Sequence, residues 1–158
     1  MALKQGDTAP DVTLPSSEGK PVSLAAEWAQ GPVVLLFFPL AFTDTCTDEL
    51  CAVRDDIGAY MGLGARVVAV SVDSPYVLDR YKREIGADYL FLSDFNREAI
   101  HAFDVVRGTP VGPGLLNASE RAAFVIGPDG GIRYAWNSTT PGLLPPFDEV
   151  KHALNGSA

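Results

Sequence analysis

The length, composition and charge of the chain exclude several classes of protein. Its 158 residues fit one domain, spanning 1–158, and leave no room for a second hydrophobic core. Hydrophobic residues make up 47% of the chain and charged residues 20%, which excludes charge-dominated disorder. The net charge of −8, without any basic run, predicts that the protein binds neither nucleic acid nor an anionic membrane surface.

The two cysteines are the residues to explain, because the rest of the chain indicates no other chemistry. The first residues lack the apolar core of a secretory signal, so we expect a cytoplasmic location. In that reducing compartment two cysteines do not form a permanent disulfide. With His101 and His152 as the only histidines they do not make a zinc-binding set, and we predict no metal and no cofactor. Redox or nucleophilic chemistry remains.

The first half of the chain predicts a hairpin, a buried strand and a helix. Turn-forming residues separate Asp11 to Leu14 from Pro21 to Leu24, and these two segments are expected to pair. The continuous apolar run Val33 to Phe38 is typical of a strand covered on both faces. A helix is expected from Asp44 to about Tyr60, because its apolar residues recur at helical spacing and Thr43 is placed to cap its start.

The second half continues the alternation of strands and helices. A strand is expected at Arg66 to Val72, followed by a helix that Pro75 opens and Gly86 ends. The side chains that this helix is expected to bury are Tyr76, Leu78, Tyr81 and Ile85. The remaining expected elements are a strand at Leu90 to Leu92, a helix at Asn96 to Phe103, a loop at Val105 to Leu116, a hairpin of Ala122 to Ile126 with Ile132 to Trp136, and a helix at Phe147 to Leu154 ended by Asn155 and Gly156.

This order of elements predicts the fold class. A hairpin, then alternating strands and helices, then a second hairpin and a final helix indicate an α/β protein with a mixed central sheet flanked by helices. A thioredoxin-like fold meets this description. Element order alone does not select it over other α/β sandwiches.

Cys46 is the best candidate for a reactive residue. It falls in the first turn of the expected Asp44 to Tyr60 helix, where unpaired amide groups and the helix dipole favour an anionic sulfur. The hydroxyl of Thr43, three residues earlier, can lie within hydrogen-bonding distance of the sulfur or of a substrate oxygen. Acidic neighbours on the same helix oppose the anion, so a cation from elsewhere in the fold is required. Arg121, which immediately precedes an apolar strand, is the better candidate for that cation, because Arg54 lies about 12 Å further along the helix.

These residues carry a resemblance to a known family. Pro39, Thr43 and Cys46 reproduce the P-x-x-x-T-x-x-C signature of peroxiredoxins, and SERAAFVIGPDGGIRY is similar to the segment that bears their active-site arginine, here Arg121. The resemblance covers nearly the whole chain. FFPLAFT and the overall spacing resemble the alkyl hydroperoxide reductase E-type subgroup, whereas the C-x-x-x-x-C spacing of Cys46 and Cys51 resembles the bacterioferritin-comigratory, or Q-type, subgroup.

The resemblance implies a thiol-dependent peroxidase with defined roles for these residues. The Cys46 thiolate would attack hydrogen peroxide or an organic hydroperoxide and become a sulfenic acid. Thr43, Arg121 and the Cys46 amide would stabilise the charge that develops on the oxygens. By analogy with the family, Pro39 would shield the sulfenic acid, and Glu49 matches a position that orients the arginine, pairing with Arg121 or Arg54. Thioredoxin or a similar dithiol protein would be the reductant, and the family favours a homodimer.

Cys51 is expected to be the resolving cysteine. Residues i and i+5 of an intact helix are about 8.6 Å and about 140° apart. A disulfide needs Cα atoms usually within about 6.8 Å, so the Cys46–Cys51 bond requires the first turns of the helix to unwind.

The sequence also allows other interpretations of the two cysteines. Cys51 could simply face the core, which would leave a one-cysteine peroxidase resolved by an external thiol. The cysteine pair could also act as a non-catalytic redox sensor. A third possibility is a cysteine hydrolase in which His101 activates Cys46.

Overall fold

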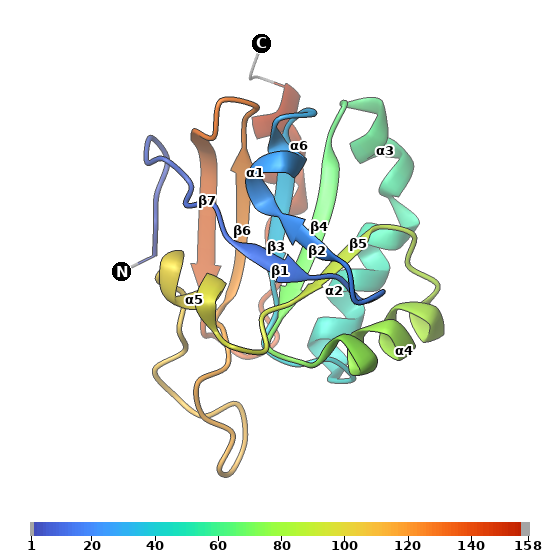
Figure 1. Ribbon diagram of the computed structural model, residues 1–158, viewed down its shortest axis with the longest axis vertical. Coiled ribbons are helices and arrows are strands. Elements are labelled where there is room, and N and C mark those ends of the chain that lie inside the picture. Colours follow the sequence, from blue (N-terminus) through green and yellow to red (C-terminus); the bar gives the residue numbers. More distant parts are fainter. Residues whose placement is uncertain (1, 156–158) are drawn as a thin grey trace.

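The computed structural model describes residues 2–155 as a five-stranded mixed sheet with helices on both faces and a small hairpin in front (Figure 1). The strand order is β5-β4-β3-β6-β7. The strands are β3 (Val33–Phe37), β4 (Arg66–Ser71), β5 (Leu90–Ser93), β6 (Arg121–Ile126) and β7 (Ile132–Ser138). The hairpin pairs β1 (Thr13–Pro15) with β2 (Pro21–Ser23). The predicted α/β fold with an N-terminal hairpin is confirmed.

Strand β3 lies at the centre of the sheet because its side chains are apolar on both faces. All five of its residues are buried, and it runs parallel to β4 and antiparallel to β6. The antiparallel register places Phe37, at the end of β3, opposite Ala122. The first residue of β6, Arg121, therefore lies at the same edge of the sheet as the loop that follows β3.

Two hydrophobic cores cover the two faces of the sheet. One face packs against β1, α1 (Leu24–Trp28) and α5 (Glu98–Ala102). The other packs against α2 (Asp44–Asp55), α3 (Ile57–Gly62), α4 (Pro75–Ile85) and α6 (Phe147–Asn155). Both layers can be followed in Figure 1. Alternate residues of β3 serve the two cores, with Leu35 facing the first and Leu36 facing the second.

The helix expected from Asp44 to Tyr60 is two helices, which corrects the sequence prediction. Asp56 separates α2 from α3 with φ −111° and ψ 13°, and it makes the tight three-residue hydrogen bonds of a turn, accepting from Ala59 and donating to the carbonyl of Val53. The Asp56 carboxylate also forms an ion pair with Lys151 of α6. A polar turn residue with its own partner interrupts the helix although the apolar spacing continues.

One further prediction about a helix is corrected, and one helix was not predicted. Tyr76 is 87% exposed rather than buried, because it is two residues from Leu78 and so lies on the opposite side of α4 from the buried Leu78, Tyr81 and Ile85. Helix α1 was not expected at all, although Ser23 caps it by accepting from the amide of Ala26. Gly156, expected to end the last helix, lies outside the described residues.

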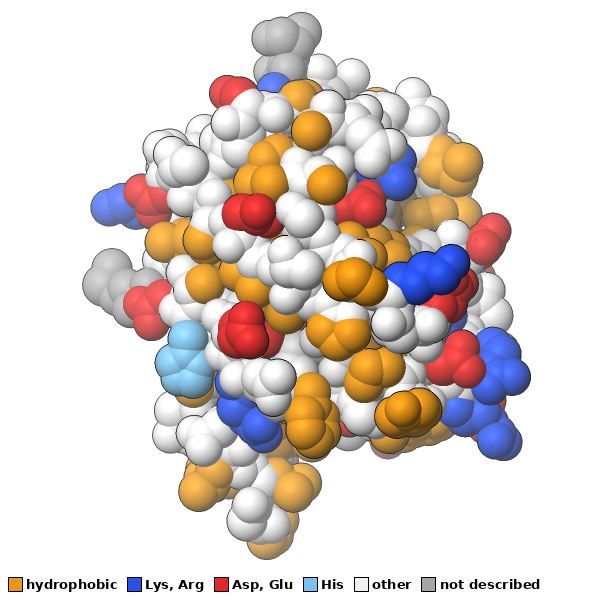
Figure 2. Space-filling model, in the orientation of Figure 1, with side chains coloured by type: hydrophobic (Ala, Val, Ile, Leu, Met, Phe, Trp, Pro, Cys, Tyr) orange, Lys and Arg blue, Asp and Glu red, His pale blue; other side chains and the backbone are white. Residues whose placement is uncertain are grey.

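A long excursion between α5 and β6 projects from the end of the sheet where β3 ends (Figure 1). Its two arms are held together by backbone hydrogen bonds between Arg107 and Ala118 and between Glu120 and Val105. Leu115 and Leu116 at its tip are 50% and 59% exposed, and Figure 2 shows apolar side chains on this projection. No helix among residues 2–155 is both long and apolar enough to cross a bilayer.

Candidate active site

The loop from Pro39 to Thr43 joins β3 to α2 and is fixed by two hydrogen bonds. The amide of Ala41 donates to Asp73 Oδ2 at 2.8 Å, and Asp73 stands just beyond the end of the neighbouring strand β4. The Thr43 hydroxyl donates to the carbonyl of Leu40 at 2.9 Å. Between them Phe42 has φ +65°, a left-handed conformation that is uncommon for a bulky residue. The chain therefore enters α2 along one defined path.

Thr43 occupies the N-cap position of α2, but its side chain makes no capping hydrogen bond. The expectation that its hydroxyl caps the helix is wrong, because that hydroxyl donates to the carbonyl of Leu40 instead. The hydroxyl oxygen keeps free lone pairs, and Thr43 lines the same hollow as Cys46.

Cys46 lies in the first turn of α2 with 1% of its side chain exposed. The Nη2 atom of Arg121 donates to its sulfur at 3.2 Å. Arg121 comes from the start of β6 and is itself buried. A guanidinium in contact with sulfur favours the anionic, nucleophilic form and offsets the acidic residues nearby on α2. The structure thus brings Arg121 to the place where the sequence required a cation.

Glu49 completes a buried triad with Cys46 and Arg121. Its Oε1 atom accepts from Arg121 Nη1 at 2.6 Å, and the carboxylate is fully buried. The partner is Arg121 and not Arg54, whose guanidinium binds Asp55 and the carbonyl of Ile85 instead. Burial raises the pKa of Glu49 to about 7, and the neighbouring Arg121 lowers it only in part. The Oε2 atom of Glu49 has no hydrogen-bond partner among the described residues, which fits a carboxyl group that is costly to ionise.

These side chains meet at a surface hollow of about 270 Å³ at the end of the sheet. Pro39, Thr43, Cys46 and Arg121 form part of its wall, and Arg107 and Val111 reach it from the projecting excursion. The rest of the wall comes from the start of α2 and from the end of β7 and the segment that follows it: Asp44, Thr45, Ser138, Thr140, Pro141 and Gly142. The hollow is small and is lined by polar and apolar residues, and Cys46 forms part of its lining although it is only 1% exposed.

Cys51 lies on the same unbroken helix as Cys46, and both are free thiols. Its side chain is half-buried and packs beside the core on the α2 face of the sheet. Because both cysteines lie in one intact helix, their Cα atoms are too far apart for a disulfide in the folded site.

His101 does not approach Cys46. It lies on α5, which packs on the face of the sheet opposite to α2, and its Nδ1 atom pairs with the carbonyl of Arg97 at 2.7 Å. This placement removes the base that a cysteine hydrolase would need. Among residues 2–155 there is also no group of three or more His, Cys, Asp or Glu side chains able to hold a metal ion.

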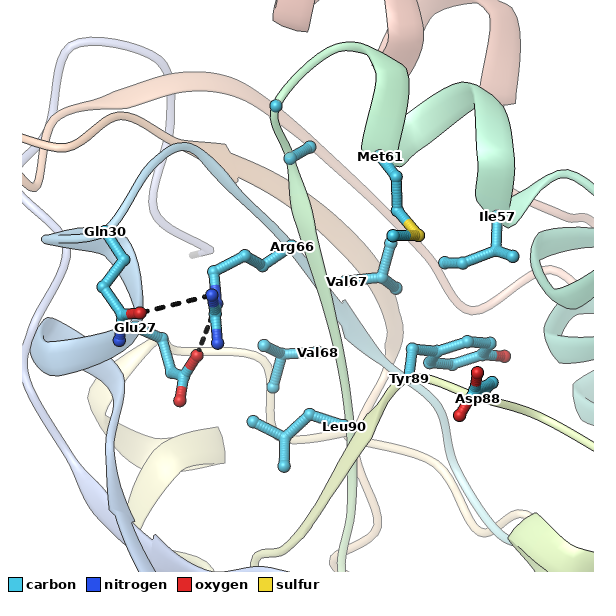
Figure 3. A pocket seen from close by; sticks show the side chains of 12 residues that line it. Glu27, Gln30, Ile57, Met61, Arg66, Val67, Val68, Asp88, Tyr89 and Leu90 are labelled. Carbon is cyan, nitrogen blue, oxygen red and sulfur yellow. Dashed lines mark hydrogen bonds and ion pairs between the residues drawn. The ribbon is translucent and has the colours of Figure 1, made fainter.

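A second hollow, of about 440 Å³, lies at the opposite end of the sheet, beside the start of β4 (Figure 3). Its one guanidinium, Arg66, is neutralised by Glu27 at 2.8 Å and also contacts Gln30. The described residues that line it include no cysteine or histidine. It therefore lacks a nucleophile of the kind found at Cys46.

Sequence reasoning missed two residues that hold the segments on either side of Cys46 in place. Asp73 holds the loop before α2, and Tyr81 of α4 places its hydroxyl 2.9 Å from the hydroxyl of Thr47 on α2. Asp73 follows an apolar strand, a position where polar side chains gather at the functional edge of a parallel sheet, and this signal could have identified it. Tyr81 was identified only as a core residue, and nothing in the local pattern indicates a partner 34 residues away.

Comparison with known proteins places the chain in a family. Residues 5–135 match the model of the AhpC/TSA family. Peroxiredoxin Bcp of Escherichia coli is 30% identical over 135 residues, covering 85% of this chain and 86% of the relative. The crystal structure of peroxidoxin BcpB from Mycobacterium tuberculosis superposes with a TM-score of 0.88 at 31% identity, covering 99% of both chains.

A third match extends the likeness to a protein with a described activity. The bacterioferritin comigratory protein of Xanthomonas campestris, whose structures concern its alkyl peroxide reduction activity, matches with a TM-score of 0.79 at 26% identity, covering 91% of this chain and 90% of that one. The E-type likeness of FFPLAFT is not specifically supported by these matches. The chain belongs to the AhpC/TSA family of peroxiredoxins and is close to its Bcp, or Q-type, members, which makes it a thiol peroxidase.

Proposed function

We propose that Cys46 is the peroxidatic residue of this thiol peroxidase and that Cys51 resolves it. The observation that carries the proposal is the 3.2 Å contact between Arg121 Nη2 and the Cys46 sulfur, two residues that line one surface hollow. Hydrogen peroxide and organic hydroperoxides are the substrates. The alkyl peroxide activity described for the Xanthomonas relative supports the second class.

In the first step the Cys46 thiolate attacks one oxygen of the hydroperoxide. A sulfur–oxygen bond forms, the oxygen–oxygen bond breaks, and the leaving oxygen takes up a proton to depart as water or an alcohol. Sulfur is oxidised and the peroxide is reduced by two electrons. Negative charge spreads over both oxygens during the displacement, and Arg121 and the Cys46 amide are the donors that stabilise it. The Thr43 hydroxyl donates to the carbonyl of Leu40, so its oxygen is an acceptor for the hydroperoxide proton.

The roles of the surrounding residues follow from their places. Pro39 forms one wall of the hollow and shields the sulfenic acid from a second peroxide. Glu49 holds the Arg121 guanidinium through Nη1, which leaves Nη2 aimed at the sulfur. Thr43 lies in the same wall, and its hydroxyl oxygen has lone pairs that can accept a hydrogen bond.

In the second step the Cys51 thiol attacks the Cys46 sulfenic acid, forming a disulfide and releasing water. Because both residues lie on the intact helix α2, its first turns must unwind before the sulfurs can meet. A dithiol protein such as thioredoxin then reduces the disulfide and is itself oxidised. We further propose that the protein acts in the cytoplasm as a homodimer, and the peroxiredoxin family resemblance supports the dimer.

Thiol counting after one equivalent of peroxide tests both steps. We expect the wild-type chain to lose both thiols as a disulfide, Cys51→Ser to form a sulfenic acid that a diketone probe captures, and Cys46→Ser to remain unreacted. A wild-type chain that keeps the Cys51 thiol would indicate a one-cysteine peroxidase with an external resolving thiol. Stoichiometric oxidation without turnover by a dithiol reductant would instead indicate a redox sensor.

A further inference from the structure

Tyr81 of helix α4 contacts the chain on both sides of Cys46. Its hydroxyl lies 2.9 Å from the hydroxyl of Thr47, the residue that follows Cys46 in the first turn of α2. Its ring centroid lies 4.8 Å from that of Phe42, four residues before Cys46. Tyr81 therefore joins a second helix to the segment that must move when the sulfurs of Cys46 and Cys51 meet.

The position of Tyr81 itself is firmly fixed. Its side chain is 1% exposed and its ring packs near Phe38 and Phe91, at centroid distances of 6.2 and 6.4 Å. Burial raises the pKa of Tyr81 to about 12, so its hydroxyl stays protonated and able to hydrogen-bond. By contrast Phe42 is 51% exposed and Thr47 is half-buried. In both contacts Tyr81 is the buried partner, and Phe42 and Thr47 are the more exposed partners that can move away from it.

We infer that Tyr81 is a positioning residue that holds the first turn of α2 in its wound form and so sets how quickly the Cys46 sulfenic acid is resolved. The inference rests on the proposed resolution by Cys51. Unwinding the first turn separates Thr47 from Tyr81, and the chain reversal at Phe42 relaxes from its strained φ of +65°. The hydrogen bond and the ring contact oppose this release, and the strain favours it.

Tyr81 has no part in the first chemical step, because it is absent from the wall of the hollow that contains Cys46 and Arg121. Its loss is therefore expected to leave the reaction with peroxide unchanged and to accelerate only the later step. A faster unwinding also shortens the life of the sulfenic acid, so less of it meets a second peroxide and becomes sulfinic acid.

The test uses the full chain with three variants: Tyr81→Phe, Thr47→Val and the double variant. We expect each to form the Cys46–Cys51 disulfide about two- to tenfold faster than wild type, as the loss of one net hydrogen bond predicts. The double variant should match the single ones, because all three remove the same bond. Stopped-flow oxidation of Cys46 should be unchanged, and the peroxide concentration that gives half sulfinic acid should rise by a similar factor.

Tyr134→Phe is the matched control. It removes a tyrosine hydroxyl that donates to Glu149 at 3.2 Å, between β7 and α6, and leaves α2 untouched. Equal disulfide rates in wild type and Tyr81→Phe, or the same acceleration in Tyr134→Phe, would overturn the inference while leaving the peroxidase proposal intact. If wild type forms no Cys46–Cys51 disulfide, thiol counting shows that the proposed resolution itself has failed. Thr47→Val keeps the test decisive if Tyr81→Phe does not fold.

Discussion

Glu49 makes the stability of this protein depend on pH in an unusual direction. Its carboxyl is fully buried, and its pKa in the folded protein is about 7, against 4.5 for an ordinary glutamate. Between these values the folded chain binds more protons than the unfolded chain, so the contribution of Glu49 to stability is present at low pH and is lost as the pH rises through about 7. The shift predicts a loss of about 2 to 3 kcal/mol between pH 5 and pH 8.

The perturbation that isolates this effect is Glu49→Gln in a Cys46→Ser background. Glutamine keeps the volume and an oxygen that can accept from Arg121, and serine replaces the neighbouring ionisable thiol with a hydroxyl. Urea unfolding of both chains at pH 5, 6, 7 and 8, under reducing conditions, gives the free energy of unfolding at each pH. The glutamine chain should gain about 2 to 3 kcal/mol relative to the glutamate chain over this range. Parallel curves would refute the reasoning, since they would mean that Glu49 titrates alike in both states.

Three further predictions concern the anchors of the site and its independence from the opposite core. Arg121→Met should slow the oxidation of Cys46 by about 100-fold or more, because a buried donor aimed at the reacting atoms is lost, and an unchanged stopped-flow rate would remove Arg121 from the reaction. Asp73→Ala should slow the same step by releasing the Ala41 amide, whereas Asp73→Asn, which keeps an acceptor, should retain most of the rate. Equal rates in both variants would contradict the anchoring role. Asp79→Ala, on the surface of α4, is the control. Ile100→Val, in the core on the other face of the sheet, should lower the free energy of unfolding by about 1 kcal/mol in urea while leaving the peroxide rate as it is, and a change in that rate would show that the two cores are coupled.

The fold could be read from the sequence because its signals are local. The apolar run of β3, Pro75 at the start of α4 and Gly86 at its end each act through neighbouring residues. The error about the length of the Asp44 to Tyr60 helix also arises because sequence signals are local. The break at Asp56 comes with an ion pair to Lys151 of α6, a partner 95 residues away that no local pattern of spacing reveals.

The site, too, has features that are local in the sequence and features that depend on distant residues. The position of Cys46 at the start of a helix is a local feature, and the need for a cation follows from the acidic residues beside it. The identity of that cation depends on β6 pairing antiparallel with β3, which brings Arg121 to the end of the strand that precedes Cys46. Asp73 and Tyr81 reach the site only through the packing of β4 and α4 beside α2, so their roles required the structure.

Arg121 also explains why α2 should stay wound until peroxide has reacted. Its two nitrogens bind Cys46 and Glu49, which lie three residues apart on one side of the helix, so the guanidinium bridges the turn that would open in the proposed resolution by Cys51. A hydrogen bond to an ionised sulfur is roughly twice as strong as one to a neutral group, and a sulfenic acid is neutral. Oxidation therefore weakens one of the contacts that hold the turn closed at the moment when unwinding becomes useful.

Hydrogen exchange measures this weakening without any peroxide. Cys46→Ser places a neutral hydroxyl where the reduced wild type has its sulfur, and it should raise the exchange rate of the amides from Thr47 to Leu50. Amides in the second half of α2, and those of β6, should exchange as in wild type because their contacts are unchanged. Equal protection of the first turn in both proteins would show that charge on the sulfur does not hold the helix, and that Tyr81 and the backbone bonds of α2 alone keep it wound.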